Sequence, residues 1–473
     1  MTMSLNRIPE KVQSIHLIAV CGTAMGALAC MLKDMGYSIT GSDAKVYPPM
    51  SDFLREKQVR VFDGFDGNNL SYGPDLVVVG NAVSKDNPEV VRMQQAGLCF
   101  CSMPQAVNHF AAAGKKQLLV AGTHGKTTTA SLLAWVLHQA GLDPSFMIGG
   151  IVKNFGSNYR VGAGPYIVIE GDEYDTAFFD KGPKFLHYRP HRGILTSVEF
   201  DHADIFRDLD HVRQAFAGYI GAMPEDSILV AYDQDANVAG LIQDAPCPVT
   251  GYGPDAGSLW HPENVQVDAP WMRFDACCGQ GVFGGFRSPM IGTHNLHNAL
   301  GVIAVAESLG LGPEVINQGL ESFQGIRRRQ EIRGVRNGIT VMDDFAHHPT
   351  AVRETLRAVR NFYSGRRIVA VFEPRTNTSM RNIFQDVYPA VFDDADLICI
   401  RQPPLLSKIP EGLRFSSEKL VADLRGRAKE AFYFPDTDAV IDFLLRTVRS
   451  GDLVVIMSNG GFDNIHERLL ARL

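Results

Sequence analysis

Short apolar runs alternate with helix-period patterns along the whole chain, and this alternation predicts an α/β protein. Apolar strands are expected at residues 15–20, 75–79, 166–169, 194–198, 339–342, 368–372, 397–400 and 453–457. Helices are expected between them, for example at about 24–35 and after Pro349. Around residues 244–280 the rhythm is lost among Pro, Gly and Cys residues, and only irregular β structure is expected there.

The alternation restarts twice, so three domains are predicted. A chain of 473 residues also suggests about three domains by its length. We expect a Rossmann-like N-terminal domain at 1–113, a central P-loop ATPase-like α/β domain at 114–333, and a C-terminal Rossmann-like α/β domain at 334–473.

Composition narrows the class of protein. The net charge of −7 and a pI near 6.1, without a basic stripe, argue against a nucleic-acid partner. Eight cysteines form no pair of zinc-spaced C-x-x-C motifs and no dense disulfide framework, which indicates a reducing cytoplasm. Residues 15–32 resemble the front of a signal peptide but are better explained as strand, turn and helix, so no membrane partner is expected.

The segment at 118–129 (LLVAGTHGKTTT) is the strongest motif, because a strand runs into a glycine-rich turn and then a helix. Backbone N–H groups of such a turn can hold phosphate oxygens, Lys126 can reach the β and γ phosphates, and the Thr127 hydroxyl can ligate Mg²⁺. Val120 stands where the usual pattern has its first glycine, and a chance Gly-Lys-Thr is the competing interpretation.

An acidic cluster follows the strand at 166–169, with four carboxylates in the six residues 170–175. A hard divalent ion such as Mg²⁺ would offset their repulsion, whereas a solvated surface loop is the alternative. Asp201 and His202 follow the strand at 194–198, and His202 is either a ligand of a second ion or a structural hydrogen-bond partner.

Several polar residues stand where elements begin or end. Asn295 opens a helix and either matches the edge of adenine or caps the helix. One of Arg327, Arg328 and Arg329 could offset charge that develops during phosphoryl transfer. Asp344 and His347 lie where a strand passes into a helix, and a purely structural Asp–His hydrogen bond is the competing view.

The N-terminal segment carries a weak dinucleotide-type pattern. Gly22 and Gly26 form an incomplete G-x-G-x-x-G, and Asp43 follows about 20 residues later, as a ribose-binding acid does. Asn81 follows the next strand. A βαβ unit that serves another nucleotide, or that merely packs, explains the same residues.

Residues 122–129, 170–175, 201–202, 294–298 (HNLHN) and 343–349 (DDFAHHP) together resemble the Mur ligases of bacterial cell-wall synthesis, in motif order over nearly the whole chain. The phosphate loop without its early glycine is the form which that family uses. The resemblance implies one domain for a UDP-sugar, a central ATPase, and a third domain for the incoming amino acid or peptide.

The resemblance further implies an ATP- and Mg²⁺-dependent amide ligase that works through an acyl phosphate. Residues 36–50, 170–180, 372–377 and 457–462 favour members that join UDP-N-acetylmuramate to the recycled murein tripeptide L-Ala-γ-D-Glu-meso-Dap, and addition of free L-alanine is the alternative. The implied protein is a cytoplasmic bacterial monomer or weak homodimer. A nicotinamide oxidoreductase using Gly22 and Asp43, or a nucleotide-gated binding protein, would be the rival classes.

The resemblance also assigns expected roles to residues of this chain. The catalytic set is Lys126, Glu170, His202, Arg329, Asp344 and His347. The nucleotide-binding set is Gly122, Thr123, His124, Gly125, Lys126, Thr127, Thr128, His294, Asn295, Asn298 and Arg329. The expected metal ligands are Thr127, Glu170 and His202. The substrate-binding set is Gly22, Ser42, Asp43, Asn81, Arg375, Ser458 and Asn459. The helix expected at 211–223 has no lysine, so a carbamylated lysine as second-metal ligand is not expected.

Overall fold

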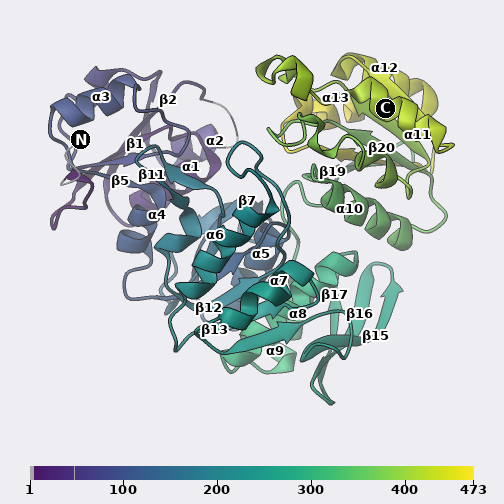
Figure 1. Cartoon of the computed structure of the whole chain (residues 1–473), viewed down its shortest axis with the longest axis horizontal. Coiled ribbons are helices and arrows are strands. Elements are labelled where there is room, and N and C mark those ends of the chain that lie inside the picture. The colour runs from purple at the N-terminus through teal and green to yellow at the C-terminus, as the bar shows by residue number, and fades with distance from the viewer. Residues whose placement is uncertain (1–4, 47, 49) are drawn as a thin grey trace.

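The computed structural model describes residues 5–46, 48 and 50–473 and has three lobes in chain order (Figure 1). Each lobe is built on its own large sheet, of five, ten and six strands respectively, and a two-stranded sheet completes the set. The predicted α/β architecture is therefore confirmed.

The N-terminal sheet is entirely parallel. Its strands are β1 (Ser14–Ile18), β2 (Ser38–Asp43), β3 (Arg60–Asp63), β4 (Leu76–Val79) and β5 (Phe100–Ser102), in the order β3-β2-β1-β4-β5. Helices α1 (Thr23–Asp34), α2 (Met50–Glu56), α3 (Pro88–Gln95) and α4 (Met103–Ala106) connect or follow the strands. The strand order reverses between β1 and β4, and open α/β sheets bind ligands at such a switch point. Gly22 and Asn81 follow these two strands.

The middle sheet places β6 (Lys116–Ala121) between β9 (Tyr166–Gly171) and β12 (Pro190–Leu195), all three parallel. The sheet continues through β7 (Ser145–Val152) and β8 (Ser157–Arg160) on one side, and through β13 (Ile228–Tyr232) and β14 (Val249–Tyr252) on the other. Because these three central strands run in one direction, the motifs that follow them meet at one edge of the sheet.

Alternate residues of β6 enter two different cores. Leu118 and Val120 pack with α5 (Lys126–Gln139), α8 (Thr293–Ser308) and α9 (Pro313–Ser322). Leu119 and Ala121 face the other way, toward α6 (Leu209–Gly221) and α7 (Ala236–Leu241). A strand buried on both faces is what its unbroken apolar run predicts. A small hairpin of β10 (Asp175–Ala177) and β11 (Asp180–Pro183) extends from the end of β9.

The expectation of irregular β structure at 244–280 is right about the β structure but wrong about its irregularity from residue 260 onward. The structure has a regular antiparallel extension of β15 (Trp260–Asp268), β16 (Trp271–Cys278) and β17 (Gly281–Ser288). Trp260, Phe274 and Phe286 are buried on one face of it, whereas much of the rest is exposed. The buried residues are spread over three strands that also contain Pro, Gly and charged residues, so no single strand shows a clean alternation.

The C-terminal sheet contains β18 (Glu331–Arg336), β19 (Ile339–Asp344), β20 (Ile368–Phe372), β21 (Leu397–Arg401), β22 (Glu430–Phe434) and β23 (Leu453–Met457), in the order β18-β19-β23-β20-β21-β22. Helices α10 (Pro349–Phe362), α11 (Ser417–Gly426), α12 (Thr437–Thr447) and α13 (Ile465–Arg472) pack against it. Strand β18 is antiparallel to β19, and the limit expected at residue 333 falls inside β18. The domain limits stay predictions.

Among the residues that the structure describes, no helix combines the length and the apolar character needed to span a bilayer.

Candidate active site

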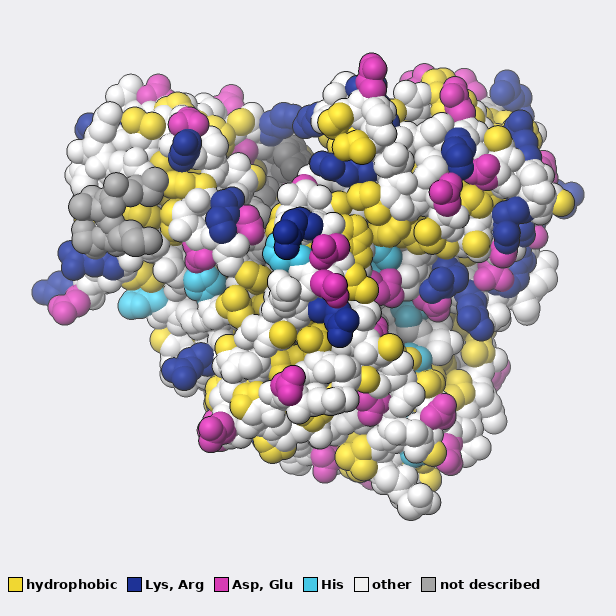
Figure 2. All heavy atoms as spheres, viewed as in Figure 1, with side chains coloured by type: hydrophobic (Ala, Val, Ile, Leu, Met, Phe, Trp, Pro, Cys, Tyr) yellow, Lys and Arg dark blue, Asp and Glu magenta, His cyan; other side chains and the backbone are white. Residues whose placement is uncertain are grey.

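All three lobes line one large cavity. Its volume is about 1350 Å³, and Gly22, Lys126, Glu170, Asp344 and Asn459 are among its lining residues. In the space-filling view a hollow separates the N-terminal and C-terminal lobes above the middle lobe (Figure 2). Residues that are far apart in the sequence are thus brought to a common space by the arrangement of the domains.

The phosphate loop leads from β6 into α5, as predicted. Gly122 and Gly125 have φ values of 134° and 79°, in the region that favours glycine. A Cβ on Gly122 would lie 2.1 Å from Thr196 Oγ1, and one on Gly125 would lie 2.7 Å from Asn298 Oδ1. Both glycines are therefore required by backbone conformation and by close packing.

Part of the expected phosphate cradle is already engaged within the protein. The N–H of Thr123 donates to the Ser197 carbonyl (2.9 Å), and that of His124 donates to Ser197 Oγ (3.0 Å). N–H groups in the first turn of α5 have no acceptor within the helix. In this structure the N–H groups of residues 125–128 are therefore better placed to meet a phosphate than those of Thr123 and His124, and the nucleotide-binding role of Thr123 and His124 stays a prediction.

Lys126 and Thr127 are held by the acidic segment that follows β9. Lys126 Nζ lies 2.8 Å from Glu173 Oε2 and donates to the Gly122 carbonyl at 2.6 Å. The Thr127 hydroxyl donates to Glu170 Oε1 at 2.7 Å. The two motifs that the sequence separates by more than 40 residues thus form one site, because β6 and β9 are neighbours.

The acidic segment is an internal ion-pair network and not a solvated surface loop. Asp172 pairs with Lys184 (2.9 Å), and Glu173 with Lys126. Glu170 accepts only from neutral donors among its described hydrogen bonds, namely Thr127 and the N–H of Gly149 (2.6 Å). Burial and then the neighbouring Asp172 charge raise the pKa of Glu170. Of these three carboxylates, that of Glu170 is thus the one whose negative charge is least neutralised by nearby lysines.

His202 meets Glu173 rather than Glu170. Its Nε2 lies 3.5 Å from Glu173 Oε1, and the residue has a φ of 53°. Burial lowers the pKa of His202, but the Glu173 carboxylate more than offsets this, and the net shift is upward. Glu173 therefore lies between Lys126 and His202, a position that the spacing of residues in the sequence did not indicate.

At the C-terminal edge of the cavity, Asp344 and His347 have different partners. Asp344 accepts from the N–H groups of Gln330 and Ala346, both at 2.8 Å. His347 Nε2 instead lies 3.8 Å from Asp201 Oδ2 in the middle domain. Burial opposes ionisation of Asp201, yet His347 holds the pKa of Asp201 well below its ordinary value. The Asp–His contact here therefore joins two domains.

Arg329 is placed beside this edge. Its guanidinium lies 4.6 Å from the centre of the Phe345 ring, and it lines the same cavity as Asp344. Burial lowers the pKa of Arg329 while the Asp344 charge raises it, with a net lowering. Arg329 is thus a cation that lines the cavity beside Asp344, and its role in phosphoryl transfer stays a prediction.

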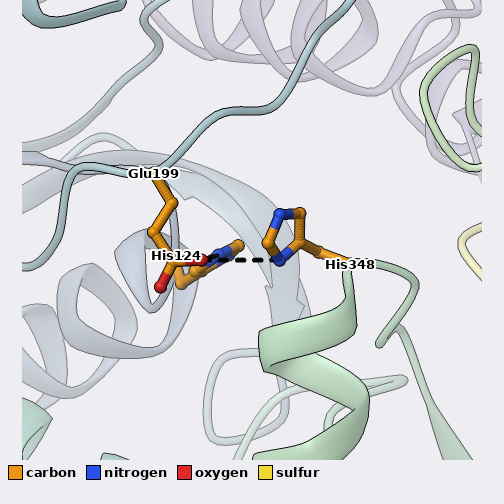
Figure 3. Close-up of side chains that lie close together, drawn as sticks. All are labelled: His124, Glu199 and His348. Atoms are coloured by element: carbon orange, nitrogen blue, oxygen red, sulfur yellow. Dashed lines mark ion pairs between the residues drawn. The ribbon is translucent and has the colours of Figure 1, made fainter. Parts of the chain in front are cut away.

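A second contact between the domains lies beside the phosphate loop, where Glu199 faces two histidines (Figure 3). Glu199 Oε2 is 3.4 Å from His124 Nε2 and 3.7 Å from His348 Nδ1, and it accepts from the Thr350 hydroxyl at 2.7 Å. His348 Nε2 lies 3.2 Å from the Phe200 carbonyl, and Nδ1 accepts from the N–H of Thr350 at 3.2 Å. His348 is thus a neutral cap of α10 that reaches the middle domain.

The start of α8 closes the cavity on another side. Asn295 Nδ2 donates to the Ile291 carbonyl (2.8 Å), and Asn298 Nδ2 donates to Asn295 Oδ1 (3.2 Å). Burial lowers the pKa of His294 to about 4, and that of His297 also to about 4. His294, Asn295 and Asn298 line the cavity together with Tyr232 and Tyr252, which gives a polar edge beside aromatic rings.

The residues expected to bind substrates are distributed unevenly. Gly22, Asn81 and Asn459 line the large cavity, whereas Asp43 lines a second one of about 570 Å³. Ser42 is buried and donates to Glu89 Oε2 (2.5 Å), and Ser458 is buried and donates to Glu373 Oε1 (2.7 Å). Both hydroxyls are turned inward in this structure. Arg375 lies nearby, with Nη1 3.4 Å from Glu373 Oε1.

Sequence reasoning did not single out Glu173, Asp201, Glu199, His348 or Thr350 for these contacts. Each stands within three residues of a residue to which a role was predicted. Adjacent positions in the same loop were visible in the sequence, but which side chain turns toward which domain was not.

Three family models cover most of the chain in order. They are "Mur ligase family, catalytic domain" at residues 14–115, "Mur ligase middle domain" at 120–306, and "Mur ligase, glutamate ligase domain" at 327–460.

Individual relatives agree with these models. The chain is similar to the UDP-N-acetylmuramate–L-alanyl-γ-D-glutamyl-meso-2,6-diaminoheptandioate ligase of Escherichia coli K12, with 38% identity over 96% of this chain and 97% of the relative. It is 31% identical to a UDP-N-acetylmuramate–L-alanine ligase of Acetivibrio thermocellus, over 98% of this chain and 96% of that one. Its structure resembles that of a murein peptide ligase from Psychrobacter arcticus 273-4, with a TM-score of 0.73, 34% identity, and coverage of 97% and 98% of the two chains. The chain belongs to the Mur ligase family.

Proposed function

We propose that this protein is an ATP-dependent ligase that joins the carboxylate of UDP-N-acetylmuramate to the amine of L-Ala-γ-D-Glu-meso-Dap. The observation that carries the choice of acceptor is the 38% identity to a tripeptide ligase over nearly the full length of both chains, against 31% to an alanine ligase. The cavity shared by three lobes supports a reaction with three substrates.

The reaction follows from the groups involved. A carboxylate is a poor acyl donor at neutral pH, so its oxygen first attacks the γ-phosphorus of ATP and ADP leaves. The amine nitrogen of the peptide then attacks the carbonyl carbon of the resulting acyl phosphate. Phosphate departs, the nitrogen loses a proton, and an amide is formed. Catalysis of such steps depends mainly on positioning and on stabilisation of charge.

The residues present fit the nucleotide. Free N–H groups at residues 125–128 and the cation of Lys126 would hold the phosphates, with Gly125 keeping the loop open against Asn298. His294, Asn295 and Asn298 would bind the adenine end. The pairing of Lys126 with Glu173 holds the ammonium at the loop until phosphate oxygens offer it a better partner.

The donor set also fits Mg²⁺. Thr127 and Glu170 are already in contact, and the Glu170 carboxylate has the weakest cationic compensation in its segment. His202, through its contact with Glu173, would serve a second ion. Mg²⁺ there would neutralise charge on the phosphoryl group.

The opposite edge of the cavity would receive the peptide. Asp344 and His347 would orient the attacking amine or the nucleotide, Arg329 would offset developing negative charge, and Arg375 and Asn459 would contact the peptide. Gly22 and Asn81 would serve the sugar nucleotide from the large cavity, and Asp43 from the second cavity. Ser458 and Ser42, whose hydroxyls are bonded to Glu373 and Glu89, would support the peptide and sugar-nucleotide sites from inside the protein. Contacts between His348, Thr350 and the middle domain would help to keep water from the acyl phosphate. The enzyme would work in the bacterial cytoplasm as a monomer or weak homodimer.

The test is an acceptor panel with the purified protein, ATP, Mg²⁺ and UDP-N-acetylmuramate. Phosphate release and the mass of the product are measured with the tripeptide, with free L-alanine and with no acceptor. Much faster amide formation with the tripeptide is expected. Equal or faster use of L-alanine would favour the alternative activity, and phosphate release that ignores UDP-N-acetylmuramate would contradict both.

A further inference from the structure

A second group of metal-ligand side chains lies on the antiparallel extension of the middle sheet, outside the active-site cavity. His261 and Glu263 of β15 and Cys277 of β16 offer one ligand atom each, and these atoms all lie within 4.8 Å of one another. Figure 1 shows β15 and β16 at the outer end of the middle lobe.

The register of the two strands explains the grouping. His261 is directly opposite Cys277, and Glu263 is directly opposite Asp275. Residues two apart along a strand share a face, and directly opposite Cβ atoms lie about 4.5–5.5 Å apart. An imidazole, a thiol and two carboxylates therefore occupy one face of the ladder. Such a site has no C-x-x-C signature, because pairing across strands assembles it.

The hydrogen bonding of His261 leaves one ring nitrogen facing the group. Nδ1 lies 3.2 Å from the Ser258 carbonyl, which can only accept, so Nδ1 carries the hydrogen. In the neutral ring Nε2 then carries the lone pair, and it lies 3.7 Å from Glu263 Oε1. A lone pair that faces a carboxylate is repelled unless a proton or a cation lies between them. Metal-binding histidines are commonly oriented in the same way, by a hydrogen bond from the ring nitrogen that does not bind the metal to a backbone carbonyl.

The distance between His261 and Glu263 and the burial of the group are compatible with a small tetrahedral ion. Bonds of about 2.0–2.3 Å to N, O and S place neighbouring ligands roughly 3.3–3.6 Å apart in a tetrahedron. The His261 to Glu263 distance is close to this. His261 and Cys277 are 4% and 3% exposed, whereas the Glu263 side chain is 55% exposed. Two ligands are thus fixed by packing, and the third is free to close on the ion.

We propose that His261, Glu263 and Cys277 bind a zinc-class divalent ion that clips β15 to β16. The mixed N, O and S donor set suits Zn²⁺ or Co²⁺ and not Mg²⁺, which prefers oxygen ligands. Binding forms a metal–sulfur bond and breaks the S–H bond of Cys277, whose proton goes to solvent. Water takes the fourth position, and Asp275 stays beside the site, where it accepts from Asn264 Nδ2 at 2.7 Å.

The experiment uses the full-length protein, stripped with a chelator and kept reduced in saturating Mg²⁺, which is then titrated with Co²⁺. We expect thiolate-to-cobalt charge-transfer absorption that saturates at one equivalent and is displaced by Zn²⁺. Cys277→Ser should abolish this absorption. Cys278→Ser is the matched control, because Cys278 is exposed and lies on the other face of β16, and it should retain the absorption. His202→Ala should also retain it, since the site is independent of the active site.

Two further measurements keep the test decisive if Cys277→Ser folds poorly. Glu263→Gln changes a mostly exposed side chain and should weaken Zn²⁺ affinity at least about tenfold, since even loss of a supporting partner commonly costs that much. Zn²⁺ should raise the unfolding temperature of the wild type and of Cys278→Ser, but not of Cys277→Ser. Absence of the sulfur absorption, its loss in Cys278→Ser, or unchanged affinity in Glu263→Gln would overturn the proposal.

Discussion

The phosphate loop lies at the end of β6, and the segment at residues 343–350 lies at the end of β19. Both strands are buried, yet the two segments are held in different ways. The loop is fixed inside the middle domain, through Lys126 with Glu173 (2.8 Å) and Thr127 with Glu170 (2.7 Å). The segment at 343–350 in the C-terminal domain is held by contacts with the middle domain, through His347 with Asp201 (3.8 Å) and Thr350 with Glu199 (2.7 Å).

This difference separates two kinds of control over the proposed reaction. The phosphate site depends on the packing of neighbouring strands, so it should persist whatever the position of the third domain. The opposite edge depends on how closely the third domain approaches. Substitutions in the phosphate loop should therefore change the rate of the chemical step. Substitutions where the middle and C-terminal domains touch should instead change the fraction of time that these two domains are in contact.

The largest effect is expected at Lys126. Lys126→Ala should lower kcat by about 10² to 10³, because a single preorganised donor to transition-state charge is commonly worth that much. Circular dichroism must accompany the assay, since the change also leaves Glu173 buried without its ion-pair partner. Lys116→Ala, an exposed lysine on β6, is the control and should keep the wild-type rate. A near-normal rate in Lys126→Ala would place ATP elsewhere.

The next effect concerns the peptide. Arg375→Ala should lower the preference for the tripeptide over L-alanine by about 10- to 100-fold, if Arg375 contacts the distal part of the tripeptide. Loss of one hydrogen bond to a charged group has an effect of this size. The ratio of kcat/KM for the two acceptors is the measurement. Arg446→Ala, an exposed arginine of α12, should leave the ratio unchanged. An unchanged ratio in Arg375→Ala would remove Arg375 from the peptide site.

His202 tests the metal assignment. His202→Ala should raise the Mg²⁺ concentration for half-maximal activity about tenfold, since loss of one group around a metal commonly costs 10- to 100-fold in affinity. Removal of bicarbonate should not change the wild-type rate, because α6 carries no lysine to form a carbamate. Recovery of a depleted enzyme on addition of bicarbonate would point instead to a carbamylated lysine.

The boundary between the domains should give a smaller effect. Thr350→Val keeps the shape of the side chain but removes its hydrogen bond to Glu199, and a loss of about 3- to 10-fold in kcat/KM is expected from one such bond. Thr447→Val, whose hydroxyl bonds only within α12 among its described contacts, is the control. If Thr350→Val changed nothing while Lys126→Ala acted as expected, this contact would have no part in the approach of the domains.

The smallest effect is a pH dependence of stability. The folded-state pKa values of His294 and His297 are about 4, below the ordinary value of 6.5. Between pH 6.5 and 4 the unfolded chain therefore binds protons that the folded protein excludes, so stability should fall as the pH falls through this window. At neutral pH the penalty is absent.

His297→Phe should reduce the slope of the unfolding free energy against pH between pH 6.5 and 4. The reduction is at most the slope that one bound proton contributes. The midpoint of thermal unfolding at pH 7 and pH 5 is the measurement, and the comparison between variants removes the contribution of other titrating groups. His109→Gln, at an exposed position, should leave the slope unchanged. An equally steep decline in His297→Phe would show that His297 does not titrate in this window.

Much of the fold could be predicted because its signals are local. The strands at Ile368–Phe372 and Leu453–Met457 match the predicted limits, and the phosphate loop is a contiguous strand, turn and helix. The regular strand order at 260–288 was missed because its apolar residues are divided among three strands. Ser42 and Ser458 lie at the ends of predicted strands. The sequence does not show that their hydroxyls bond to the buried carboxylates of Glu89 and Glu373, because this depends on tertiary packing.

The sequence by itself determined where the glycine-rich turn, the acidic segment and the histidine motifs lie, because each motif is short and follows its own strand. The tertiary structure decided how the motifs combine. Adjacent parallel strands bring Thr127 to Glu170, domain approach brings His347 to Asp201, and strand register brings His261 to Cys277. These pairings depend on contacts between residues distant in sequence, and hydrophobic periodicity along one segment does not specify which other segment it will meet.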